Sequence, residues 1–324
     1  MHTRRELLRN LSALAAAGAG LPALSQDLSA KPFKIVVPFA AGTTTDSIAR
    51  FFAERAHAIT GQVSIVENRP GALGNIGADA VAKDKPDGYT LLFSGNNTHA
   101  ANVHLFPKLP FDPQKDFAPI TTYAQVPFIL VVNPRTVPVK TLKEFVAFAK
   151  SRPGKLSYAS SSAGNRVAAE LLKQTAGFYA VSIDYKSGPQ AIMDVLSGQV
   201  DFYFGDPPQV MSHVRAGKVT ALGVSMNKRL TTAPEIPTVA EQGYPNFNLF
   251  SWLGVWTTAG APPELVNATS RLVNRVMDSP EGRDILEKRG LIPLPGTPES
   301  LRALQTRDTE TWGTVIKAAG IKFE

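Results

Sequence analysis

The chain has 324 residues, a formal net charge of +7 and no cysteine. The lack of cysteine excludes disulfides, thiolate metal sites and cysteine-based catalysis. A mature chain of roughly 300 residues suits two domains. The basic residues are scattered and match no nucleic-acid recognition motif, so we expect no nucleic-acid partner.

The first 25 residues have the features of an export signal. Arg4 and Arg5 precede an uncharged, mostly apolar run over residues 11–24, and small residues precede Gln26. The run is too short for a membrane span, which needs about 20 apolar residues. We therefore predict a twin-arginine-like signal peptide over 1–25 and a periplasmic mature protein. Sec signals also begin with basic residues, so the export route stays open.

The first predicted elements are an apolar strand beginning at Phe33, a turn of small residues, and a helix. The turn contains Gly42, and Thr43 and Asp46 have the spacing of a capping box. Free backbone N–H groups and the positive end of the helix dipole favour an anion there. The lysine of a phosphate-binding P-loop is missing, which favours a carboxylate. An ordinary strand–turn–helix with a routine N-cap is the alternative interpretation.

Strands and helices then alternate along the chain. The predicted strands are 63–67, 89–93, 128–132, 156–160, 181–185, 200–204, 219–224 and one near 252–256; the helices are 76–83, 141–150, 166–176, 188–196, 263–278, 280–290 and 298–319. Such alternation predicts parallel sheets with helices on their faces and ligands beyond the carboxyl ends of the strands. Small polar loops follow several strands, at 94–98, 160–165 and 205–208.

Several short motifs occur in a fixed order. They are Val36-Val37-Pro38-Phe39, residues 66–72, residues 86–92, Tyr185-Lys186-Ser187-Gly188, residues 237–241 and residues 317–322. This ordered set resembles the Bug-type extracytoplasmic solute receptors of tripartite tricarboxylate transporters, over essentially the whole mature chain.

The resemblance implies an α/β type II periplasmic-binding-protein fold. Two Rossmann-like α/β domains would be joined by crossing strands around a ligand cleft. We expect residues 26–126 and 249–324 in the first domain and residues 127–248 in the second.

The resemblance also implies which loops surround the ligand carboxylate. The first turn gives Phe39, Ala40, Gly42, Thr43, Thr44, Thr45 and Asp46; the second loop gives Ser94, Asn96, Asn97 and Thr98; the opposing domain gives Ser160, Ser161, Ser162 and Asn165, with Asp206 nearby.

Individual residues allow more than one interpretation. Phe39 either contacts the ligand or closes the core, and Asp206 either accepts a hydrogen bond from a ligand or stabilises its turn. Asp46 is expected to stiffen its loop rather than touch an anion, because two carboxylates repel. Trp252 and Trp256 are expected in core or hinge packing.

Arg166 stands where the family often has a histidine. Arginine can hold a carboxylate with two parallel hydrogen bonds. Our hypothesis is that Arg166 grips the distal carboxylate of a diacid; a solvent-facing helix charge is the alternative.

These observations predict a monomeric receptor that captures a small di- or aromatic carboxylate by domain closure, without cofactor or metal. The receptor would deliver the ligand to the membrane components of a tripartite tricarboxylate-type transporter. A ligand-sensing partner of a membrane sensor kinase is an alternative. A hydrolase that pairs His99 with a serine of residues 160–162 is a weaker one, because no H-E-x-x-H or G-x-S-x-G motif occurs.

Overall fold

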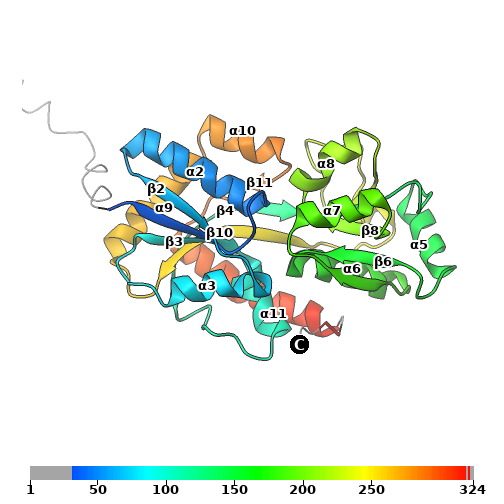
Figure 1. Ribbon diagram of the computed structural model, residues 1–324, viewed down its shortest axis with the longest axis horizontal. Helices are drawn as coiled ribbons and strands as arrows, with labels where there is room; N and C mark the ends of the chain where they lie inside the picture. The colour runs from blue at the N-terminus through cyan, green and yellow to red at the C-terminus, as the bar shows by residue number, and fades with distance from the viewer. Residues whose placement is uncertain (1–30, 319, 322–324) are drawn as a thin grey trace, which may run out of the picture.

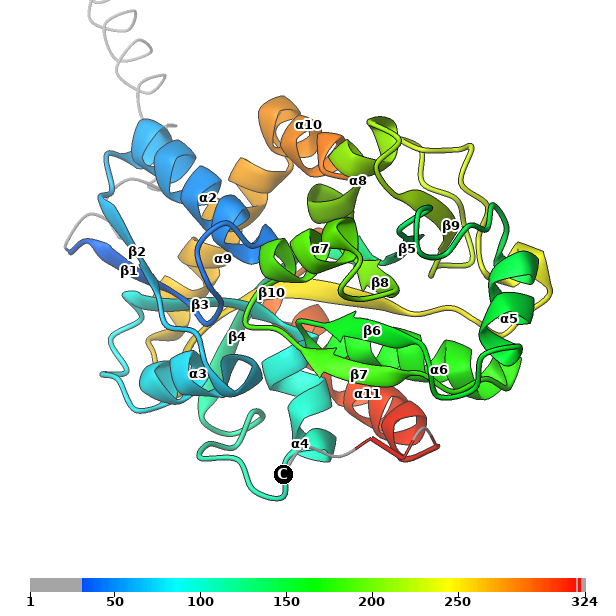
Figure 2. The same cartoon turned by 45° about the vertical axis from the view of Figure 1, so that its right-hand side comes forward.

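The computed structural model describes residues 31–318 and 320–321, so the predicted signal peptide lies outside the described residues. The described chain forms two lobes, each built on one sheet with helices packed on its faces (Figures 1 and 2). The α/β fold predicted from the alternating pattern is confirmed.

The first lobe holds a six-stranded sheet. Its strands, in spatial order, are β11 (Ile292–Pro293), β4 (Phe117–Pro127), β10 (Phe250–Thr258), β3 (Thr90–Gly95), β1 (Phe33–Val37) and β2 (Ser64–Asn68). Strand β1 runs parallel to β2 and β3, whereas β10 runs antiparallel to β3 and β4. The helices of this lobe are α2 (Thr44–Thr60), α3 (Asn75–Ala82), α4 (Asn102–Leu105), α9 (Pro263–Met277), α10 (Pro280–Lys288) and α11 (Pro298–Ala318), with the short turns η1 (Ala72–Gly74) and η2 (Asn97–Ala101).

The second lobe holds a five-stranded sheet. Its strands, in spatial order, are β7 (Val181–Asp184), β6 (Ser157–Ser160), β8 (Phe202–Gly205), β5 (Ile129–Val132) and β9 (Thr220–Val224). Helices α5 (Leu142–Lys150), α6 (Ala163–Ala176), α7 (Gly188–Ser197) and α8 (Pro207–Arg215) pack around it, and η3 (Ala240–Gln242) lies in the segment that leads back to β10.

Two chain segments connect the lobes. Strand β4 enters the second lobe through Phe128, and the chain returns from β9 to β10. Ser225 fastens these crossings together, because its hydroxyl accepts a hydrogen bond from Phe128 N at 2.9 Å and donates one to Leu249 O at 2.5 Å. The end of α11 also reaches the second lobe, where Gln174 Nε2 on α6 donates to Ala318 O at 2.7 Å.

The sequence pattern explains the layers of the first lobe. Ile35 on β1 and Phe93 on β3 pack against one face of α2, whose Ile48, Phe52 and Ala56 recur at helical spacing and are buried. The segment over 94–98, expected to be a loop, differs from that expectation. Strand β3 continues to Gly95, and η2 then begins at Asn97.

Candidate functional site

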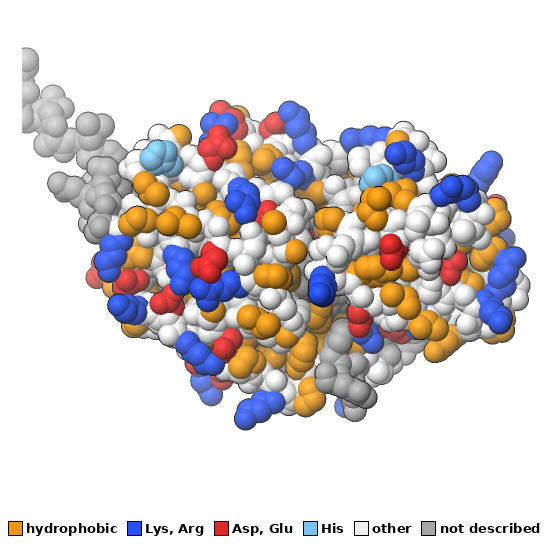
Figure 3. Space-filling model, in the orientation of Figure 1, with side chains coloured by type: hydrophobic (Ala, Val, Ile, Leu, Met, Phe, Trp, Pro, Cys, Tyr) orange, Lys and Arg blue, Asp and Glu red, His pale blue; other side chains and the backbone are white. Residues whose placement is uncertain are grey.

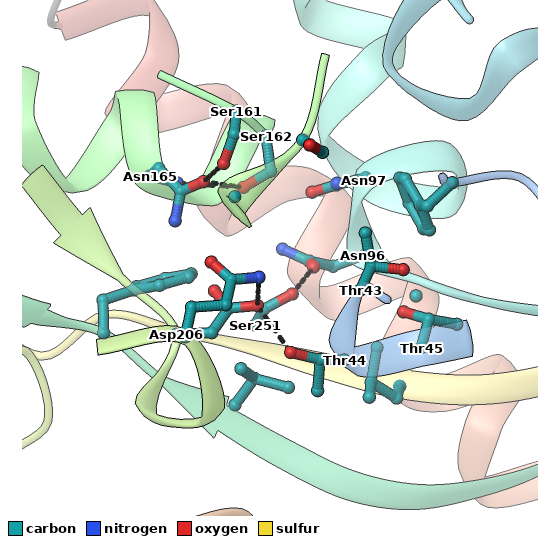
Figure 4. Close-up of a pocket in the computed structure, with 18 of the residues that line it drawn as sticks. Thr43, Thr44, Thr45, Asn96, Asn97, Ser161, Ser162, Asn165, Asp206 and Ser251 are labelled. Atoms are coloured by element: carbon teal, nitrogen blue, oxygen red, sulfur yellow. Dashed lines mark hydrogen bonds between the residues drawn. The ribbon is translucent and has the colours of Figure 1, made fainter. Parts of the chain in front are cut away.

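A cavity lies between the two lobes, and both contribute to its walls (Figure 4). Its volume is about 70 Å³, whereas pockets for drug-sized ligands measure about 300–1,000 Å³. The cavity therefore suits a molecule of a few carbon atoms.

Four helices begin at this cavity. The lining includes Thr44 at the start of α2, Ser162 at the N-cap of α6, Gly188 at the start of α7 and Asp206 at the N-cap of α8. The first N–H groups of a helix lack partners within the helix and carry the positive end of its dipole. Starts from both lobes converge on one small space, so the site favours a negatively charged ligand.

The first loop is held rigid by Asp46. Its Oδ2 accepts a hydrogen bond from Gly42 N at 2.9 Å, and its Oδ1 accepts from Arg50 Nε at 3.0 Å and Asn68 Nδ2 at 2.8 Å. Burial opposes ionisation, but these hydrogen bonds outweigh it and hold the pKa of Asp46 below its usual value. Asp46 lies outside the cavity lining and stiffens the turn, as the sequence suggested.

Thr43 is the N-cap of α2. Its Oγ1 accepts a hydrogen bond from Asp46 N at 3.5 Å and donates to Ala40 O at 2.8 Å. Thr43, Thr44 and Thr45 all line the cavity together with Phe39. The turn therefore presents hydroxyl groups and free backbone N–H groups on the same side.

Asn96 and Asn97 extend the first-lobe wall. Both side chains are buried and line the cavity, and the side-chain Oδ1 of Asn96 accepts a hydrogen bond from Ser251 Oγ on β10. Asn96 Nδ2 and Asn97 Oδ1 have no hydrogen-bond partner among the described residues. A buried polar atom without a partner is costly, so these two atoms indicate where ligand or water atoms bind.

Asn165 organises the opposing wall. Its Oδ1 accepts hydrogen bonds from Ser161 Oγ at 2.8 Å and Ser162 Oγ at 2.7 Å (Figure 4). Its Nδ2 donates to Phe204 O at 2.6 Å. Ser162 also caps α6 by accepting a hydrogen bond from Asn165 N at 3.2 Å. The side chain of Asn165 thus fixes the positions of both serine hydroxyls.

Asp206 forms a direct contact across the cleft. Its Oδ2 accepts a hydrogen bond from Thr44 Oγ1 of the first lobe at 2.9 Å, and one from Gln209 Nε2 at 3.4 Å (Figure 4). Desolvation in the cleft raises the pKa of Asp206 to about 6, and hydrogen bonds from the Thr44 and Asn165 side chains oppose this rise.

Nine lining residues were not among the predicted site residues: Gly95, Val126, Phe128, Lys186, Ser187, Gly188, Gln209, Ser251 and Leu253. The motif Tyr185-Lys186-Ser187-Gly188 was noted in the sequence, and its place after a strand and before a helix was the available signal. Gln209 and Ser251 carried no such signal, because the sequence does not show which side chains of a first helical turn or of a strand face the cleft.

The structure places seven predicted residues outside the cavity lining: Ala40, Gly42, Asp46, Ser94, Thr98, Ser160 and Arg166. Ser94 and Thr98 are buried and their hydroxyls lie 2.8 Å apart, so they bond to each other. Arg166 Nη1 lies 3.4 Å from Asp184 Oδ1 at the end of β7. Its guanidinium is therefore part of an ion pair beside the cavity rather than in its wall.

His99 is also outside the cavity lining. The residue is fully buried, and its ring stacks on Trp256 at a centroid distance of 3.8 Å. Its Nδ1 lies 2.8 Å from Thr98 Oγ1. The pairing of His99 with a serine of residues 160–162, on which the hydrolase alternative depended, is not formed.

Trp252 and Trp256 lie in the core, as predicted from the sequence. Both are fully buried, with Trp252 Nε1 donating to Asp308 Oδ2 at 2.6 Å and Trp256 Nε1 to Gln305 Oε1 at 3.3 Å. Over the described part of the chain, no cluster of three or more His, Cys, Asp or Glu side chains is arranged to hold a metal ion. No helix within residues 31–318 is both long and apolar enough to cross a membrane.

Two lobes around an anion-favouring cavity define a solute-binding receptor. The family model described as the tripartite tricarboxylate transporter family receptor, TctC, matches residues 48–321. The chain belongs to this family, whose receptors are periplasmic solute-binding proteins. The resemblance found in the sequence is thereby confirmed.

Similar proteins agree with this assignment. Protein BugT of Bordetella pertussis is 32% identical over 314 residues, covering 96% of each chain. The solved structure of R. palustris Rpa4515 with adipate has a TM-score of 0.88 and 31% identity, covering 92% of this chain and 100% of that one. The structure of the periplasmic binding protein BugD has a TM-score of 0.85 and 29% identity, covering 91% of this chain and 99% of that one.

Proposed function

We propose that this receptor captures a small di- or aromatic carboxylate by closing its two domains, and delivers it to the membrane components of a tripartite tricarboxylate-type transporter. The observation that carries the proposal is the convergence of four helix starts, from both lobes, on one small cavity. The adipate in the similar structure, a dicarboxylate, supports this ligand class.

The proposed site consists of the predicted loops of residues 39–46, 94–98 and 160–166 together with Asp206. In each loop, the residues in the cavity wall contact the ligand and the others support them. Lys186 joins the site as the one basic side chain among the described residues that line the cavity. It also lines a neighbouring groove of about 710 Å³ between the lobes, where the distal part of a longer acid would extend. Lys186 is thus placed to serve a distal carboxylate, the role that the sequence suggested for Arg166.

The proposed domains are residues 26–126 with 249–324, and residues 127–248. Closure of one domain on the other surrounds the carboxylate with N–H and hydroxyl donors, and only the closed form contacts the ligand from both sides.

We propose that the mature protein is a periplasmic monomer released from its signal peptide. On the face shown in Figure 3, basic side chains are interspersed with acidic ones.

A thermal-shift panel on the mature chain from Gln26, refolded to remove carried-over ligand, tests this function. The panel holds C3–C8 dicarboxylates, citrate, amino acids, nicotinate, benzoate and phthalates, each paired with its methyl ester or amide. An acid at one hundred times its Kd stabilises by about 2.7 kcal/mol, a rise of several degrees in Tm. A panel in which no acid exceeds its uncharged partner would contradict carboxylate recognition.

A further inference from the structure

Asp206 places a hydrogen-bond acceptor inside a cavity built for an anion. Among the described residues that line the cavity, Asp206 and Lys186 are the two with charged side chains. The hydrogen bonds that Asp206 accepts from Thr44 and Gln209 both end on Oδ2, and the Asn165 side chain is a further hydrogen-bonding neighbour of the carboxylate. The buried Oδ1 of Asn97, which has no partner in the described part of the chain, is a second acceptor in the same wall.

A simple carboxylate ligand cannot satisfy these acceptors. An ionised carboxylate offers acceptor oxygens only, and two carboxylates close together in a desolvated site repel each other. A ligand atom that bonds directly to the ionised Asp206 carboxylate must therefore carry a hydrogen to donate. A hydroxyl or an ammonium group meets this requirement.

Thr44 fixes where this donor lies on the ligand. Thr44 is the first residue of α2, where we expect the ligand carboxylate to bind. Its Oγ1 is 2.9 Å from Asp206 Oδ2. Thr44 thus belongs to the expected carboxylate site and is also hydrogen-bonded to Asp206. A donor that reaches Asp206 belongs on a carbon next to, or one removed from, that carboxylate.

We propose that Asp206 is a specificity-determining residue that selects, among small carboxylates, those with a hydroxyl or ammonium group beside the carboxylate. The proposal rests on the proposed function and narrows its ligand class to hydroxy and amino acids. Lys186 and Asp206 carry opposite charges, which suits an acid with both a negative group and a donor.

Matched acids test the proposal on the unmodified mature protein by isothermal titration calorimetry at pH 7.5. The series are succinate, malate and aspartate; glutarate, 2-hydroxyglutarate and glutamate; and propionate, lactate and alanine. In at least one series the hydroxy or amino acid is expected to bind about tenfold or more tightly than its plain parent. Whether the hydroxy acid or the amino acid binds more tightly then shows whether the ligand group beside Asp206 is a hydroxyl or an ammonium.

Substitution of Asp206 assigns the selectivity to this side chain. We expect Asp206→Asn to reduce the preference to about threefold or less, while Asp278→Asn, the same change at an exposed ion pair with Arg283 outside the cavity lining, leaves it intact. Binding of a plain diacid as tightly as its hydroxy and amino partners would overturn the inference but not the proposed function. Failure of every acid to bind would contradict the proposed function itself. If Asp206→Asn does not fold, the matched acids still decide the question on the unmodified protein.

Discussion

Asn165 is the side chain on which the second-lobe wall depends. It is 1% exposed and bonds to two serine hydroxyls and to Phe204 O. Asn165→Ala leaves the buried Phe204 carbonyl without its partner and removes the amide oxygen to which both serine hydroxyls bond. We therefore expect a loss of about 1–3 kcal/mol in the free energy of unfolding and weaker ligand binding. Urea unfolding and calorimetry measure the two effects. Ser182→Ala, on β7 and outside the cavity lining, is the control and should change neither.

His99 gives the protein a pH dependence. Burial lowers the pKa of His99 to about 3, below its ordinary value near 6.5. The unfolded chain therefore binds a proton at a higher pH than the folded chain does, and the folded state loses stability as the pH falls from 6.5 towards 3. We expect His99→Phe, which retains an aromatic ring against Trp256, to flatten this loss.

Urea unfolding at pH 7, 6, 5 and 4 measures the effect of His99. The change in stability per pH unit should be smaller in His99→Phe than in the unmodified protein. His57 is exposed, so His57→Gln should leave the slope as it is. Equal slopes in all three proteins would show that another group controls the acid response.

The sequence indicated polar residues in the loops that follow strands. It did not indicate polar side chains whose orientation is set by how the strands pack. Asn96 and Asn165 were predicted from the family resemblance, which implies that their loops surround the ligand carboxylate. Ser251 was missed, because its approach to Asn96 is created by the antiparallel pairing of β10 with β3. For Arg166 a grip on a distal carboxylate was the hypothesis and a solvent-facing charge the alternative. Its ion pair with Asp184 depends on the parallel pairing of β7 with β6, which the sequence does not show.

At the scale of elements, the turn between β1 and α2 combines backbone shape with binding. Gly42 has a φ of +82°, and its N–H donates to Asp46. Gly154 has a similar φ of +73° in a turn of the second lobe, and neither residue has an atom within 4 Å of an added Cβ. Both glycines therefore face the same backbone penalty on substitution, but only Gly42 supports the cavity.

We expect Gly42→Ala and Gly154→Ala each to destabilise by about 1–2 kcal/mol, the cost of a left-handed conformation for a residue with a side chain. Only Gly42→Ala should also weaken ligand binding, because it disturbs the turn that presents Thr43 and Thr44. Thermal unfolding and calorimetry on both variants make the comparison. Equal ligand affinities would mean that the turn does not shape the site.

The helix predictions succeeded where apolar spacing and caps agreed. The helix predicted over 141–150 is one such case: Thr141 is the N-cap of α5, and its Oγ1 accepts a hydrogen bond from Glu144 N at 3.1 Å. The 94–98 segment was less predictable, because its polar residues are typical of a loop. Burial of Ser94 and Thr98 against each other keeps this segment in a strand and a helical turn.

At the scale of the whole molecule, the hydrogen bond between Thr44 and Asp206 joins the lobes across the cleft, far along the chain from the crossing strands. Thr44 is 4% exposed, and its hydroxyl is the group that reaches the opposite lobe. The bond forms only when the lobes are close together. It therefore stabilises the closed arrangement without contributing to the fold of either lobe.

Thr44→Val removes this hydroxyl with little change of shape, and Thr60→Val makes the same change at the far end of α2, where Thr60 Oγ1 bonds to Ala56 O. Loss of one hydrogen bond of about 1–1.5 kcal/mol lowers affinity about five- to tenfold in Thr44→Val. Small-angle X-ray scattering without ligand and with saturating ligand gives the radius of gyration of the open and closed forms. The variants are then compared at one subsaturating ligand concentration. There Thr60→Val should close as the unmodified protein does, and Thr44→Val should close less. A Thr44→Val protein that binds and closes normally would show that contacts to the ligand alone bring the two lobes together.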